Sequence, residues 1–81
     1  MKGFQMVAPF SRQVKITNET QGKPMMFPTP AIAVAVLLAT GYKAVGFINP
    51  ATVLVRQGML TFRAELPTKG EAEMMFATLS R

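Results

Sequence analysis

The side chains that do most enzyme chemistry are almost missing from this chain of 81 residues. It has no histidine and no cysteine, and all four of its acidic residues are glutamates. General acid–base catalysis would therefore fall to a glutamate or a lysine whose ionisation its surroundings had shifted. Metal sites built from histidine or cysteine are excluded, and so are disulfides. We predict a non-enzymatic protein without a cofactor or a metal ion.

The glutamates have structural roles that explain them better than catalysis does. Glu71 follows Thr68 by three positions, which is the spacing of a helix capping box. Glu65 lies two residues from Arg63 in the same expected strand, where an ion pair would keep its carboxylate ionised. The two serines have no evident neighbouring base that would activate them as nucleophiles. No residue is left with catalysis as its best explanation.

Basic residues exceed acidic ones, with a formal net charge of +5 and an isoelectric point near 10.3. An excess of this size favours polyanionic partners, which means nucleic acid or an anionic membrane surface. The nine cationic residues are spread along the chain and form no tail. The charge is therefore explained equally well as a means of keeping a small apolar protein in solution.

The first third of the chain predicts two strands. Residues 13–17 alternate polar and β-branched side chains, which places Val14 and Ile16 on one side of a half-buried strand. Residues 18–23 have turn chemistry, and residues 24–27 suit an edge strand, where a proline is tolerated.

A helix is expected next, over residues 31–40. Thr29 is a good N-cap, Pro30 suits the first helical position, and Gly41 suits the position just beyond the helix. Several β-branched residues alternate with alanine inside this segment, however, so a buried strand remains an alternative. Although residues 24–42 carry no charge, their prolines leave a helix far too short to cross a bilayer of about 30 Å.

The second half predicts a strand over residues 42–48, a hairpin and a final helix. In the hairpin, residues 52–56 pair with residues 59–66 across a Gln57–Gly58 turn. This register places Val55 opposite Leu60 and Val53 opposite Phe62, all on one face. The final helix begins at Thr68 and carries one apolar stripe at helical spacing, formed by Ala72, Met75, Phe76 and Leu79.

The other face of the hairpin supplies the candidate binding residues. Arg56 and Arg63 share it with Leu54, Met59 and Thr61, and Lys15 joins them if the first strand belongs to the same sheet. We therefore predict Lys15, Arg56 and Arg63 as residues that bind a partner or nucleic acid. Cations mixed with apolar groups suit an acidic protein surface or a single strand of nucleic acid. The absence of aromatic rings for base stacking counts against nucleic acid, and a merely solvated face is the plain alternative.

Two further patterns concern organisation and partner contacts. Each half of the chain reads strand, Gln-Gly, strand, Pro-Thr, helix, which suggests a duplicated ββα unit. Two such units could be related by a pseudo-two-fold axis. Chance similarity is the alternative explanation. The seven methionines include two adjacent pairs, and one member of each pair is expected to point away from the core. Exposed methionine often marks a protein-binding patch.

The predicted fold is α+β in one small globular domain, residues 1–81: a mostly antiparallel sheet of four to five strands with two helices on one face. The expected function is that of a small binding or regulatory protein, of the accessory or inhibitor type common in mobile genetic elements, that docks on a protein or a protein–nucleic-acid complex. The alternatives are direct nucleic-acid binding by the basic sheet face and a structural subunit of a larger assembly, such as a virion; a homo-oligomer is compatible with each. The start of the chain, residues 1–6, has no sustained apolar run, so no secretory signal is expected and the cytoplasm is the expected location.

Overall fold

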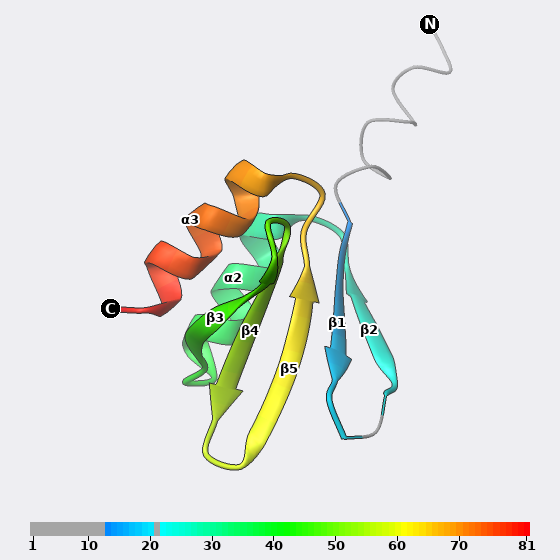
Figure 1. Ribbon diagram of the computed structural model, residues 1–81, viewed down its shortest axis with the longest axis vertical. Helices are drawn as coiled ribbons and strands as arrows, with labels where there is room; N and C mark the ends of the chain where they lie inside the picture. Colours follow the sequence, from blue (N-terminus) through cyan, green and yellow to red (C-terminus); the bar gives the residue numbers. More distant parts are fainter. Residues whose placement is uncertain (1–12, 21) are drawn as a thin grey trace, which may run out of the picture.

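The α+β prediction is confirmed by the computed structural model, which describes residues 13–20 and 22–81. The expectations for residues 1–6 and for Gln21 in the first turn lie outside the described residues. Five strands and two helices follow one another along the chain (Figure 1). Their bounds are β1 Val14–Asn18, β2 Pro24–Phe27, α2 Pro30–Ala39, β3 Lys43–Asn49, β4 Thr52–Gln57, β5 Leu60–Glu65 and α3 Lys69–Leu79.

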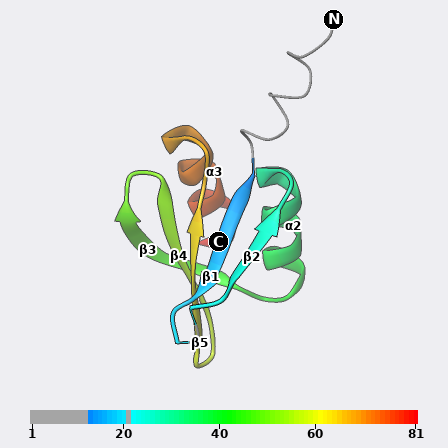
Figure 2. The ribbon, with the colours of Figure 1, turned by 90° about the vertical axis from the view of Figure 1, so that its right-hand side faces the viewer.

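The strands form one antiparallel sheet in the order β2-β1-β5-β4-β3, and the helices cover one of its faces. The β1–β2 hairpin forms one end of the sheet and β3 the other; α2 lies beside β2, and α3 packs on β3 and β4 (Figures 1 and 2). The unit strand, strand, helix does occur twice, as β1-β2-α2 and β4-β5-α3. Because β1 lies beside β5, the second unit repeats the first by a shift of two strands along the sheet, and no two-fold axis relates them.

The core lies between this covered face and the two helices. Alternation along the strands sends Val14, Ile16, Val53 and Val55 into it, as their spacing predicted. The helices contribute small or apolar residues at helical spacing: Ala33 and Leu37 from α2, and Ala72, Met75 and Leu79 from α3. A stacked pair of rings, Phe47 and Phe76, joins β3 to α3 with centroids 4.8 Å apart.

The register of the β4–β5 hairpin differs from the expectation by two residues. Val55 lies opposite Phe62, Val53 lies opposite Ala64, and the turn consists of Gly58 and Met59. Gly58 has a φ of 59°, and no other residue type has a positive φ in the described part of the chain. Glycine at the first of the two turn positions is the pattern of a type II′ turn, whereas the expected turn would also have required a positive φ at Gln57. A slip of two residues keeps every side chain on its face, except that Met59 lies in the turn.

The segment after Pro28-Thr29 is a helix, as preferred, and not the alternative strand. The hydroxyl of Thr29 accepts the N–H of Ile32 at 3.2 Å, and Pro30 begins the helix. At the other end, Gly41 has a φ of 86° and the N–H of Tyr42 donates to the carbonyl of Leu37 at 2.9 Å, which completes a Schellman motif. Among the described residues, no helix has the length and apolar character needed to span a membrane.

Helix α3 begins at the predicted capping pair. The hydroxyl of Thr68 accepts the N–H of Glu71 at 3.2 Å and donates to its carboxylate at 3.0 Å. We expect Thr68→Ala to lower the free energy of unfolding by about 1 kcal/mol, because the first turn loses an acceptor for one of its unpaired amides. Urea unfolding followed by circular dichroism measures this, with Thr78→Ala, farther along the same helix, as the control. Equal losses in the two variants would show that the cap contributes nothing special.

Candidate protein-docking surface

Lys15, Arg56 and Arg63 do lie on one face of the sheet, the face turned away from the helices, which we term the open face. Their strands are adjacent in the order β1, β5, β4, so the assumption that Lys15 joins the hairpin is confirmed. Lys15 and Arg56 are exposed, whereas Arg63 is partly buried. The alternation of the strands brought these three cations to one face, as the sequence predicted.

Two of these cations have acidic neighbours that differ from the expected ones. The Nε atom of Arg63 lies 3.2 Å from a carboxylate oxygen of Glu19, a charge contact without hydrogen-bond alignment. The expected pair of Arg63 with Glu65 is therefore wrong: Glu65 lies directly opposite Lys15 on the adjacent strand. Spacing favours Glu65 because residues two apart on a strand share a face, but the β1–β2 turn places Glu19 closer to Arg63.

Arg56 has a different environment, since its cross-strand partner on β3 is another cation, Lys43. Like charges directly opposite each other are mildly destabilising. The ammonium of Lys43 donates to the main-chain carbonyl of Arg81 at 2.6 Å, beyond the end of α3. Of the three predicted residues, Arg56 alone has no glutamate opposite it or within an ion-pair distance in the described part of the chain. The open face keeps an excess of cations around Arg56 and Lys43, but Glu19 and Glu65 offset Arg63 and Lys15, which weakens the face as a polyanion site.

Helix α2 presents the stronger candidate surface. All ten of its residues are apolar, yet only Pro30, Ala33 and Leu37 are buried. The large side chains Ile32, Val36 and Leu38 remain 45%, 40% and 53% exposed. A helix on the surface of a globular domain ordinarily turns a polar face outward, and a helix that is apolar all round is ordinarily buried. The exposed side of α2 is therefore apolar surface left without a partner inside this domain.

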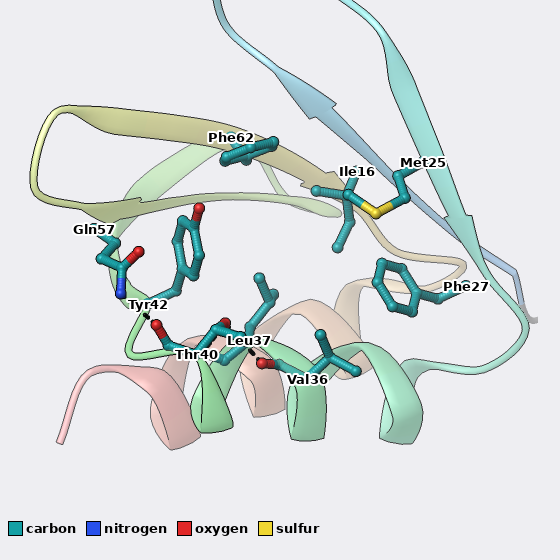
Figure 3. A pocket seen from close by; sticks show the side chains of 9 residues that line it. All are labelled: Ile16, Met25, Phe27, Val36, Leu37, Thr40, Tyr42, Gln57 and Phe62. Atoms are coloured by element: carbon teal, nitrogen blue, oxygen red, sulfur yellow. Dashed lines mark hydrogen bonds between the residues drawn. The ribbon is translucent and has the colours of Figure 1, made fainter.

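A hollow of about 310 Å³ lies on the β2 side of α2, between the helix and the sheet (Figure 3). Phe27 and Leu37 point into it, and Val36 lies at its border with the exposed side of α2. At one end, the ring of Tyr42 meets the ring of Phe62 edge to face, with centroids 5.6 Å apart. The remaining lining residues are Ile16, Met25, Thr40 and Gln57.

The polar groups of this hollow are mostly engaged with the protein. The amide of Gln57 donates to the carbonyl of Thr40, and the hydroxyl of Thr40 donates back to the carbonyl of Val36 at 2.8 Å (Figure 3). These bonds fix the end of α2 against the end of β4. What the hollow offers a partner is mainly apolar contact, which suits an inserted aliphatic or aromatic side chain.

A second hollow, of about 470 Å³, forms a groove on the other side of α2, between α2 and α3. The methionine pair of α3 divides as the sequence predicted, since Met75 is fully buried and Met74 is 69% exposed on the rim of this groove. Its other lining residues are Pro30, Ala31, Val34, Ala35, Leu38, Glu71 and Thr78. Grooves between two helices are common docking sites for the apolar face of another helix.

The lack of a polar side in α2 permits an exposed flank, but it does not predict the two hollows beside the helix. They depend on how far α2 stands from β2 and from α3, and no residue pattern encodes those separations. The one available signal was the absence of any polar side in residues 31–39. No protein-family model, no curated protein and no solved structure matches this chain.

Proposed function

We propose that this chain is a small non-enzymatic binding or regulatory protein that docks on a protein or a protein–nucleic-acid complex. Its contact is the helical layer, by which we mean the outward surface of α2 and α3 with the hollows on either side of α2. The observation that carries the proposal is the exposed apolar side of α2. An accessory or inhibitor role in the cytoplasm belongs to the same proposal and rests on the small, basic, cysteine-free sequence.

Energetics favour this surface over the open face of the sheet. Burying apolar area contributes about 25 cal/mol per Å², and Ile32, Val36 and Leu38 offer such area together on one helix. Hollows beside them can receive the large side chains that dominate binding energy in protein interfaces. On the open face, by contrast, Glu19 and Glu65 stand beside two of the three candidate cations.

Affinity capture from a lysate of the native host tests the proposal. The bait is the full chain, and the comparison is Leu38→Glu, which places a charge in the helical layer at a half-exposed position that should tolerate it. We expect the wild type to retain a specific protein and Leu38→Glu to retain at least tenfold less, because a carboxylate would have to be buried unpaired. The matched control is Met59→Glu, which adds the same charge in the β4–β5 turn at a site that is 97% exposed.

A nuclease-treated lysate and labelled oligonucleotides distinguish docking on a protein from direct binding of nucleic acid. If the basic open face binds nucleic acid directly, capture will vanish on nuclease treatment, oligonucleotides will bind at low salt, and Arg56→Glu will weaken that binding. Each phosphate contact would then lower the logarithm of the affinity by about 0.7 to 0.9 per logarithmic unit of salt. That pattern, together with unchanged capture by Leu38→Glu, would refute docking through the helical layer.

A further inference from the structure

We propose that the helical layer pairs with the helical layer of a second copy of this chain, in an antiparallel arrangement about a two-fold axis perpendicular to α2. The inference rests on one part of the proposed function, that the helical layer is a docking surface, because both use the same apolar surface. It names the occupant of that surface, and three properties of the layer support a second copy: its net charge, the position of charge along it, and the distribution of large and small side chains.

The net charge of the helical layer removes the repulsion expected between two basic proteins. Among the described residues, the charged groups of α3 and its end are two cations and two acids, and α2 has none. The excess charge lies on the strands and turns, with Lys15, Lys23, Lys43, Arg56 and Arg63 against Glu19 and Glu65. Two copies that met through their helical layers would therefore turn the basic surfaces away from each other.

Charge also changes along the layer, from acidic to basic. Helices α2 and α3 run in the same direction, because they follow β2 and β5, which are both antiparallel to β1, and each turns back along the sheet from the same end (Figure 1). The first half of α3 carries one cation, Lys69, and two acids, Glu71 and Glu73, whereas Arg81 follows its last turn. An antiparallel second copy brings the Arg81 end of one layer over the Glu71 end of the other, and it also opposes the helix dipoles. A parallel copy would place like ends together.

Side-chain size also differs between the two ends of the groove. Leu38 projects at one end and is 53% exposed, whereas the corresponding position at the other end is occupied by the small residue Ala31. Turning the second copy end to end therefore places each Leu38 over the Ala31 end of the other groove. A surface that meets itself across a two-fold axis needs this kind of self-complementarity.

The size of the contact sets the expected strength. Each helix is about 15 Å long, and the two helices of one layer lie about 10 Å apart. The area that such a layer can bury is small compared with the roughly 800 Å² per partner that specific complexes bury. Complete burial of Ile32, Val36, Leu38 and Met74 would remove from water the equivalent of about two whole aliphatic side chains per copy. We therefore expect a weak dimer, with a dissociation constant in the micromolar range or above.

Sedimentation equilibrium of the full chain between 5 and 500 μM tests the inference. The wild type should pass from monomer to dimer in this range, and Leu38→Glu should raise the dissociation constant at least tenfold. Arg81→Glu should weaken the dimer about threefold, because it removes the charge match at each end. Met59→Glu, on the far turn, should dimerise as the wild type does. Circular dichroism of each variant shows whether the fold is retained, and Ala35→Glu serves as a second layer variant.

The results separate this inference from the proposed function. A wild type that stays monomeric up to 500 μM overturns pairing of two copies, and capture of a host protein that depends on Leu38 would then still support docking on another protein. A dimer that both layer variants leave intact overturns the assignment of the interface. A dimer sensitive to Leu38→Glu supports the inference, even if the lysate yields no other protein and docking on a foreign partner fails.

Discussion

Met75→Ala is expected to lower the free energy of unfolding by about 2 to 5 kcal/mol, the largest effect of any single truncation we propose. Met75 is fully buried and is one of the largest side chains in the core, where α3 faces the sheet. Truncation removes apolar contacts and leaves a cavity that close-packed neighbours refill only in part. A domain this small has a stability of only about 5 to 10 kcal/mol, so the loss would shift the urea midpoint strongly.

The adjacent residue supplies a matched control for this prediction. Met74→Ala makes the same chemical change one position earlier in α3, at a side chain that is 69% exposed. We expect a change of less than about 0.5 kcal/mol, because surface truncations away from special contacts cost little. Urea unfolding by circular dichroism measures both. Similar losses for the two variants would mean that α3 does not present Met75 to the core.

Gly41→Ala is expected to lower the free energy of unfolding by about 2 to 3 kcal/mol, the second of the large effects. Gly41 adopts a φ of 86° in the Schellman motif that ends α2, and this conformation costs an L-residue about 1 to 2 kcal/mol. A Cβ atom built there would lie 2.9 Å from the side-chain nitrogen of Gln57. That nitrogen ends an exposed, flexible side chain and donates to the carbonyl of Thr40, so the added methyl group moves it aside and weakens a hydrogen bond worth at most about 1 kcal/mol.

Gly58→Ala separates the two contributions to this effect. Gly58 also has a positive φ, of 59°, but no atom lies within 4 Å of the Cβ that would be added. We therefore expect only the conformational cost of about 1 to 2 kcal/mol there. Thermal or urea unfolding of both variants gives the difference between them. If Gly58→Ala costs as much as Gly41→Ala, the contact with Gln57 is irrelevant to the stability of the helix end.

Sequence predicted the elements well where short-range chemistry fixes them. Thr29 and Thr68 cap the two helices, Gly41 ends the first, and the alternation around Val14 and Ile16 sets the buried side of β1. The hairpin register was the exception, because Gly58 can occupy either the first or the second position of a two-residue turn in the same sequence. Only the positive φ of Gly58, with Met59 after it, selects the observed turn.

The composition and residue spacing by themselves determined the α+β class, the apolar character of α2 and the placement of Arg56 and Arg63 on one face of the hairpin. These follow from local preferences. Successive side chains of a strand point to opposite faces, and the free backbone groups at a helix end are capped by residues within three or four positions. Tertiary structure alone decided that Lys15 joins these arginines, that Glu19 approaches Arg63, that Glu65 stands opposite Lys15, and which side of α2 stays uncovered. The physical reason is that strand order and the placement of helices over a five-stranded sheet bring together residues far apart in the chain, and no local spacing records which of them will meet.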